Sequence, residues 1–208
     1  MRKMEIILAS ASPRRKELLE QIGLSPRVIP SLVKETAKAD TPGELVMELA
    51  REKAMEVAAR LEREERESGA PAGGSGPARL VVGADTVVAV DGDILGKPKT
   101  EEEARAMIRR IAGRTHQVFT GVALAGGGRC RVFAAESLVE VYPMTEEEIA
   151  SYVAAGESMD KAGAYGIQGR FAAFIKKLSG SYTNVMGLPV GRLYQEMKAF
   201  SEGRESDD

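Results

Sequence analysis

The sequence of 208 residues contains a single cysteine, Cys130, and a single histidine, His116. One cysteine excludes a disulfide within the chain and agrees with a reducing compartment such as the cytoplasm. One cysteine and one histidine also exclude a Cys/His zinc cluster. A Cys-His pair remains formally open, but Cys130 lies in "GGGRCRVF", with no helix start beside it to activate a thiolate. Hydrolytic chemistry in this chain must therefore depend mainly on carboxylates, lysine, arginine and a hard metal ion.

Long apolar runs and an excess of one charge are also missing. No run approaches the roughly 20 apolar residues that a membrane-spanning helix needs. Glu5 interrupts the short apolar run near the N-terminus, which we interpret as a core strand and not a signal peptide. The formal net charge is -2, so electrostatics gives no reason to expect nucleic acid as a partner. We therefore expect a cytoplasmic protein with neither a membrane nor a nucleic-acid partner.

Apolar periodicity, capping residues and turn residues predict an α/β fold. The predicted strands cover residues 4–9, 27–33, 80–90, 116–125, 131–141 and 172–177, with a break at 83–86. The predicted helices cover residues 13–22, 41 to beyond 61, 100–112, 145–155 and 188–200. We expect one domain over residues 1–200, with a flexible insertion at about 63–78 that becomes rich in Gly, Pro and Ser, and a disordered acidic tail at 201–208.

The run "SPRR" places two arginines at the predicted start of the first helix. Ser12 is the predicted N-cap and Pro13 the first helical residue, so Arg14 and Arg15 fall in the first turn. This end of a helix attracts anions, and two cations without an acid are unfavourable there. Backbone N–H groups and two guanidinium groups would suit a phosphate. The alternative is that both arginines are solvated and only cover nearby surface.

Lys53 falls inside the apolar face of the long helix that begins near residue 41. It lies in the same i, i+4 row as Leu49 and Val57. A lysine in that position is unfavourable unless it has an ion-pair partner or faces a polar cleft. Lys53 is therefore a candidate functional residue. The alternative is that the helix is partly exposed there and the ammonium group reaches solvent.

The run "VVGADTVV" places Asp85 inside a β-branched strand segment, although aspartate is depleted from strands. Gly83 permits either a β-bulge or the close approach of another backbone. We interpret Asp85 as a functional carboxylate, with the alternative that it caps a turn. A hairpin centred on Asp91 and Gly92 would return the chain and bring Lys97 near Asp85.

Two arginines, two lysines and an aspartate in such positions are typical of a polyphosphate site. The aspartate can hold Mg²⁺ or Mn²⁺ or activate a water, and the cations neutralise the charge that develops in phosphoryl transfer. Neither glycine-rich phosphate fingerprint is present: G-x-x-x-x-G-K-[ST] is absent, and no G-x-G-x-x-G follows a predicted strand. The run "DKAGAYGIQG" is rich in glycine but fits neither spacing.

In several runs the sequence resembles the Maf family of nucleoside triphosphate pyrophosphatases. These runs are "LASASPRRKELL", "REKAMEVA", "VVGADTVV" with "ILGKP", "GRTHQVFTGVAL" and "MDKAGAYGIQGRFAAFIKKLSGSYTNVMGLP", in this order from residue 8 to about 200. The resemblance implies a mixed central sheet with flanking helices and two lobes around a cleft, similar to the inosine triphosphate pyrophosphatases. It also implies a cytoplasmic, often homodimeric enzyme that uses a divalent cation to hydrolyse a nucleoside triphosphate to the monophosphate and pyrophosphate.

The resemblance assigns roles residue by residue. Asp85 matches the family's proposed general base. Where the family usually has two consecutive acidic residues, this sequence has Lys34 in place of the first, followed by Glu35. The implied catalytic residues are Asp85, Lys53, Lys97 and Glu35, with Asp85 and Glu35 as metal ligands. The implied substrate-binding residues are Ser10, Arg14, Arg15, Thr86 and Gln168, of which Arg14, Thr86 and Gln168 match positions linked to substrate choice.

The form "DKAGAYGIQG" resembles the subgroup that acts on dTTP and UTP. Thymine and uracil present an N3–H donor beside an O4 acceptor, and the amide of Gln168 offers the complementary acceptor and donor. We therefore expect hydrolysis of dTTP and UTP, or of modified pyrimidine triphosphates. The alternatives are a Maf enzyme of another base specificity, such as 7-methyl-GTP, and a non-catalytic nucleotide-binding regulator of cell division.

Overall fold

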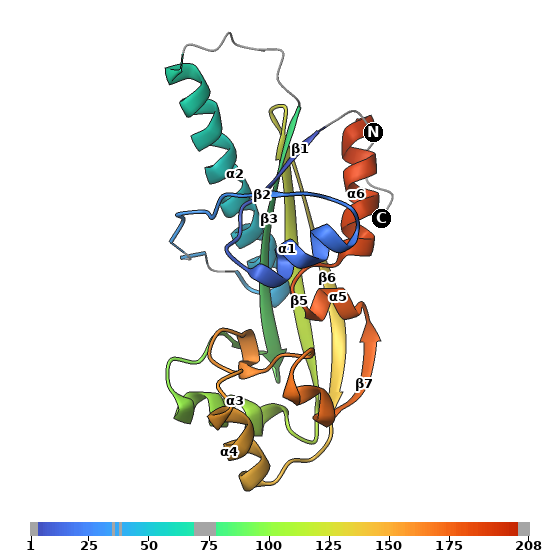
Figure 1. Cartoon of the computed structure of the whole chain (residues 1–208). Helices are drawn as coiled ribbons and strands as arrows, with labels where there is room; N and C mark the ends of the chain where they lie inside the picture. The colour runs from blue at the N-terminus through green and yellow to red at the C-terminus, as the bar shows by residue number, and fades with distance from the viewer. Residues whose placement is uncertain (1–3, 35, 38, 69–77, 204–208) are drawn as a thin grey trace. The chain divides into compact units, whose positions relative to one another are not determined.

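The computed structural model describes residues 4–34, 36–37, 39–68 and 78–203 (Figure 1). In these residues, seven strands form one sheet in the order β2-β1-β3-β5-β6-β7, and β4 pairs with β3. β1 is parallel to β2 and β3, whereas β3–β4 and β6–β7 are antiparallel pairs. The strands are β1 (Glu5–Leu8), β2 (Arg27–Val28), β3 (Arg79–Val90), β4 (Asp93–Leu95), β5 (Thr115–Gly126), β6 (Arg129–Val141) and β7 (Ile175–Gly180). The predicted α/β class with a mixed sheet is confirmed.

The helices begin where capping residues predict. Thr41 and Thr145 form complete capping boxes with Glu44 and Glu148, and each threonine side chain accepts a hydrogen bond from the backbone N–H of its glutamate. The helices are α1 (Pro13–Gln21), α2 (Pro42–Glu67), α3 (Glu101–Ile111), α4 (Glu146–Ala154), α5 (Tyr182–Val185) and α6 (Val190–Glu202), with the 3₁₀ helices η1 (Ala162–Ala164) and η2 (Arg170–Phe174). Among the residues described, no helix is both long and apolar enough to span a membrane.

The chain divides into two compact units. Unit 1 comprises Met1–Asp85, Gly121–Ala134 and Leu188–Asp208, and unit 2 comprises Thr86–Thr120 and Ala135–Gly187. β3, β5 and β6 contribute residues to both units. Each unit has its own apolar core, since one buried cluster lies entirely within unit 1 and another entirely within unit 2. Two units agree with the two lobes that the family resemblance implies.

In unit 1, α2 packs directly on β3 and β5 because glycines face it. A side chain at Gly83 would overlap the backbone of α2 at Ala50 and Ala54, and one at Gly121 would overlap the backbone at Val46. These contacts confirm the close-approach interpretation of Gly83. The predicted break in this strand at 83–86 was wrong, because β3 runs unbroken from Arg79 to Val90.

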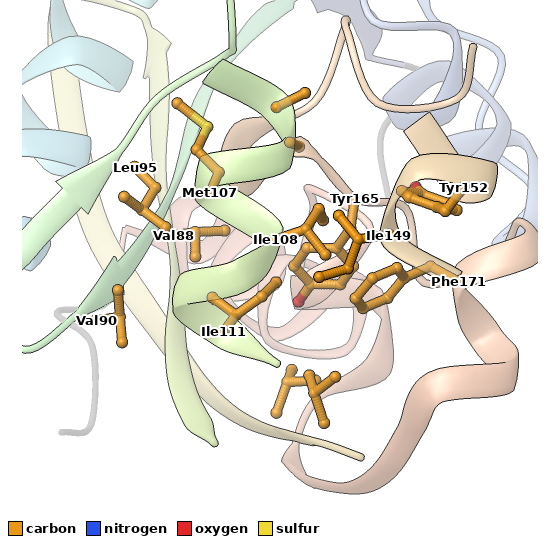
Figure 2. Packing of buried hydrophobic residues seen from close by; sticks show 14 of the residues in the cluster. Val88, Val90, Leu95, Met107, Ile108, Ile111, Ile149, Tyr152, Tyr165 and Phe171 are labelled. Atoms are coloured by element: carbon orange, nitrogen blue, oxygen red, sulfur yellow. The ribbon is translucent and has the colours of Figure 1, made fainter. Parts of the chain in front are cut away.

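In unit 2, the core gathers side chains from β3, β4, α3, α4 and the segment around η2 (Figure 2). Three buried aromatic rings lie at its centre. The ring centroids of Tyr165 and Phe171 are 4.7 Å apart, and those of Tyr152 and Phe171 are 5.0 Å apart. Because Tyr165 and Phe171 flank residues 166–170, this contact holds both ends of that segment in the core.

Several predicted boundaries need correction. β2 covers only residues 27–28 and not 27–33. The last strand begins at Ile175, because residues 170–174 form η2. α2 continues to Glu67, so residues 63–67 are helical and do not belong to an insertion. Glutamate and arginine fill this last stretch, and their helix propensity and ion pairing support a helix without an apolar face.

Two predictions fall partly outside the described residues. Residues 69–77 of the predicted insertion lie there, as do residues 204–208 of the predicted tail. Within the tail, α6 includes residues 201–202 and ends at Gly203, which adopts the left-handed conformation of a helix C-cap.

Candidate functional site

A buried ion pair connects α2 to β3 in unit 1. Lys53 Nζ donates a hydrogen bond to Asp85 Oδ1 at 2.7 Å, and each side chain is only 13% exposed. Buried charges of this kind are retained when they are paired. Gly83 lies two residues before Asp85 on the same face of β3, so it lets α2 come close enough for Lys53 to reach the carboxylate. One contact thus explains both the lysine in an apolar helix face and the aspartate in a strand.

Arg15 holds the end of β1 against β3. Its Nη1 donates to Ser10 Oγ and to the backbone oxygen of Ala84, both at 2.9 Å. Arg15 is therefore not the solvated surface residue of the alternative interpretation. Ser12 occupies the N-cap position of α1 as predicted, but its side chain makes no capping hydrogen bond.

Ser10 is arranged as a hydrogen-bond donor. Its buried Oγ accepts from Arg15 Nη1 at 2.9 Å and from the backbone N–H of Ser12 at 3.3 Å. Two donors occupy both lone pairs of a hydroxyl oxygen, so the Ser10 proton is directed to a further acceptor. The half-buried Arg14 lies in the same first turn of α1, which contains no acidic residue. The Ser10 hydroxyl and the arginines of this first turn suit an anion such as a phosphate group.

Thr86 belongs to a chain of hydrogen bonds in unit 2. Its Oγ1 lies 3.0 Å from Thr120 Oγ1, and Thr120 Oγ1 donates to the backbone oxygen of Asn184 at 3.0 Å. A carbonyl oxygen only accepts, so the Thr120 proton is used there and Thr86 must be the donor to Thr120. The Asn184 amide holds the far end of the chain through Val118 and Ser137.

Lys97 follows β4 in unit 2, where its side chain is exposed. The last pair of the β3–β4 hairpin joins Val88 to Leu95, so the same register continued by two residues sets Lys97 opposite Thr86. The backbone oxygen of Gly96 accepts from the N–H of Gly163 at 3.0 Å, which places "DKAGAYGIQG" beside this end of the hairpin. The expected approach of Lys97 to Asp85 concerns residues of different units and stays a prediction.

Gln168 is exposed at a tight turn of unit 2. The N–H of Gly169 donates to the oxygen of Gly166 at 3.2 Å and closes the turn. Within the described part of the chain, the Gln168 amide has no hydrogen-bond partner. Its donor and acceptor are therefore available to a ligand.

The expected divalent cation can be tested against the donors at hand. Glu35 lies outside the described residues, and those described contain no group of three or more His, Cys, Asp or Glu side chains suited to a metal. Asp85 remains as a candidate metal ligand. Its Oδ1 accepts a hydrogen bond from Lys53, and its carboxylate has a second oxygen. Mg²⁺ commonly binds through one or two carboxylates, substrate phosphates and waters. Asp85 together with a bound phosphate fits that mode of binding.

Sequence reasoning missed several buried polar residues of unit 2. Thr120 and Asn184 are fully buried, and His116 contacts Tyr165, with Nε2 2.7 Å from the tyrosine oxygen. Burial lowers the pKa of His116 from 6.5 to about 4 and raises the pKa of Tyr165. For Thr120 and His116 the usable signal was a polar residue inside an apolar strand, the same signal that singled out Asp85, whereas Asn184 lies in the short α5.

Comparison with known proteins decides the family. A family described as Maf-like protein matches residues 5–200. The chain belongs to this Maf family. It is 50% identical over 93% of its length to a curated protein from Agathobacter rectalis, of which the match covers 96%. A protein from Symbiobacterium thermophilum is 47% identical over 94% of both chains, and one from Bacillus cereus (strain AH820) is 45% identical over 97% of both. All three relatives carry the name dTTP/UTP pyrophosphatase.

Among solved structures, this Maf-family chain has a weak likeness to the Ham1 protein of Staphylococcus aureus. The two are 17% identical with a TM-score of 0.36, over 66% of this chain and 71% of that one.

The predicted site residues divide between the units: Ser10, Arg14, Arg15, Lys53 and Asp85 belong to unit 1, and Thr86, Lys97 and Gln168 belong to unit 2.

Proposed function

We propose that this Maf-family chain hydrolyses dTTP and UTP to the nucleoside monophosphate and pyrophosphate. The observation that carries the proposal is near-full-length identity of 45–50% to the three curated relatives of that name. The site geometry supports it, because unit 1 presents the Ser10 hydroxyl beside Arg15 for a phosphate and the buried Asp85 carboxylate for a water or a cation.

In the proposed reaction, a water oxygen bonds to the α-phosphorus as the bond from that phosphorus to the oxygen bridging to the β-phosphate breaks. The leaving pyrophosphate keeps the electron pair, and a water proton passes to Asp85. Lys53 orients the Asp85 carboxylate through the bond to Oδ1. Ser10, Arg14 and Arg15 bind and orient the phosphates. A Mg²⁺ or Mn²⁺ ion held by Asp85, and by Glu35 as a second ligand, would offset the negative charge of the triphosphate.

Base selection is proposed for unit 2. The amide of the exposed Gln168 offers both an acceptor and a donor to a base edge, and Thr86 is proposed as a second substrate-binding residue because the family resemblance assigns it that role. Lys97 is proposed to neutralise phosphate charge.

We also propose a cytoplasmic location, because a chain with one cysteine suits a reducing compartment. A homodimer is proposed on the family resemblance alone.

The substitution Asp85→Asn tests whether the site is catalytic. It keeps the size of the side chain but removes its charge and basicity, so pyrophosphate release from dTTP should fall at least roughly 100-fold. The matched control is Asp93→Asn, because Asp93 is an exposed aspartate that pairs with Arg110 in unit 2. Control activity should stay within about twofold.

Activity of a folded Asp85→Asn protein within a few-fold of the unmodified chain would refute the role of Asp85. If the unmodified chain binds dTTP but releases no pyrophosphate with either Mg²⁺ or Mn²⁺, the result would instead favour the non-catalytic regulator.

A further inference from the structure

The turn that carries Gln168 is held at both ends by the unit 2 core. Tyr165 and Phe171 flank residues 166–170, and their ring centroids are 4.7 Å apart. Figure 2 shows both rings among the buried side chains of this core. Tyr152 adds a third restraint, because its hydroxyl oxygen accepts from the N–H of Gly166 at 3.2 Å. The backbone around Gln168 is thus fixed although its side chain is exposed.

Glu157 restrains the turn from its other side. Its Oε2 accepts from the backbone N–H of Arg170 at 2.9 Å, which satisfies a donor at the start of η2. The same carboxylate occupies the place that a side chain on residue 169 would need, since a Cβ at Gly169 would overlap Oε2. Glu157 therefore contacts the residues immediately after Gln168.

Lys161 completes the arrangement. Its Nζ donates to the backbone oxygen of Glu157 at 2.6 Å and to Asp160 Oδ1 at 2.5 Å. Its aliphatic stem packs where a Cβ on Gly166 would be, with Cε 2.7 Å from that position. The Lys161 side chain thus occupies the space beside Gly166, and the Glu157 side chain occupies the space beside Gly169.

We propose that Glu157 is a positioning residue for base recognition by Gln168. A pyrimidine edge is read by two hydrogen bonds only when the amide is held in place, and an ordered turn lowers the entropy lost when the base binds. Glu157 holds the turn from behind without touching the base. This inference rests on the proposed function, in which Gln168 contacts the base.

The test compares kcat/KM for dTTP with kcat/KM for CTP in the full-length chain. We expect the unmodified chain to prefer dTTP by at least roughly tenfold, and Gln168→Ala to reduce this ratio to about threefold or less. Glu157→Ala should reduce the ratio to a similar value, mainly by raising the KM for dTTP. Glu157→Gln should restore most of the ratio, because its amide oxygen can still accept from Arg170. Glu147→Ala is the matched control, an exposed glutamate in the first turn of α4, and should leave the ratio unchanged.

Gly169→Ala provides a second variant in case Glu157→Ala does not fold. Its Cβ displaces the Glu157 carboxylate, so it should lower the ratio as well. The inference is overturned if folded Glu157→Ala, or Gly169→Ala in its place, keeps the full ratio while Gln168→Ala loses it. That result would leave the proposed function intact. If the unmodified chain shows no preference for dTTP and Gln168→Ala changes nothing, both the inference and the proposed role of Gln168 fail.

Discussion

Acidification should destabilise this protein through a single buried imidazole. His116 is 1% exposed, and its Nε2 lies 2.7 Å from the hydroxyl oxygen of Tyr165. Burial lowers the pKa of His116 to about 4, while burial raises the pKa of Tyr165, so both groups are neutral at pH 7. The unfolded chain binds a proton at the ordinary histidine pKa of 6.5, which the folded chain does not do until about pH 4.

The sign and size of the effect follow from this difference. Between about pH 6.5 and pH 4 the unfolded state binds more protons, so the free energy of unfolding decreases as the pH falls. With folded and unfolded pKa values of about 4 and 6.5, the loss is about 2 kcal/mol at pH 5 and about 3 kcal/mol at pH 4. Above pH 7 the imidazole is neutral in both states and contributes no pH dependence.

The assay is urea unfolding of the unmodified chain and of His116→Gln at pH 7.5, 6.0 and 5.0. Glutamine does not titrate and can still hydrogen-bond to Tyr165, and the chain has no other histidine. Carboxylates titrate in both proteins, so the difference between the two pH profiles isolates His116. Unfolding free energies that change in parallel, within about 0.5 kcal/mol over this range, would refute the reasoning.

Three further substitutions test separate parts of the account. Arg14→Lys should lower kcat/KM for dTTP by about tenfold, because an ammonium group lacks the planar fork that binds phosphate; unchanged kinetics would contradict a phosphate contact by Arg14. Gly83→Ala should lower the urea midpoint by an amount equivalent to about 1–3 kcal/mol, because its Cβ meets the α2 backbone; full stability would contradict the close packing. Thr120→Val should cost about 1 kcal/mol in urea unfolding, because it removes the bond from the Thr120 hydroxyl to the backbone oxygen of Asn184, which keeps the N–H of Gly187 as a donor, whereas Thr120→Ser should cost less than half of that.

Sequence reasoning succeeds here where the deciding interaction is local. Thr41 and Thr145 predict helix starts because a capping box joins residues three positions apart. Lys53 and Asp85 were recognisable because each contradicts the pattern of its own element, a lysine in an apolar helix face and an aspartate in a strand. The pattern states that each needs a partner but does not name it. Their mutual bond depends on how α2 packs on β3, and only the fold provides that.

The remaining site features depend on contacts between distant segments. The hydroxyl of Thr86 is bonded to Thr120, which is bonded to the backbone of Asn184, and these residues come together only in the folded chain. Glu157 looks like an ordinary surface glutamate in sequence, and its contact with the Gln168 turn exists because Gly169 has no side chain. The short β2 is a related case, since residues 29–33 have strand-like composition but continue the pairing with β1 only through the bond from Ile29 N–H to the oxygen of Leu8.

The most direct test of the proposed function is pyrophosphate release by the purified chain over dTTP, UTP, CTP and 7-methyl-GTP, with Mg²⁺ and with Mn²⁺. The account predicts that kcat/KM for dTTP and UTP exceeds that for CTP and 7-methyl-GTP by at least roughly tenfold. Equal hydrolysis of CTP, or a preference for 7-methyl-GTP, would contradict it and assign this Maf-family chain a different base specificity.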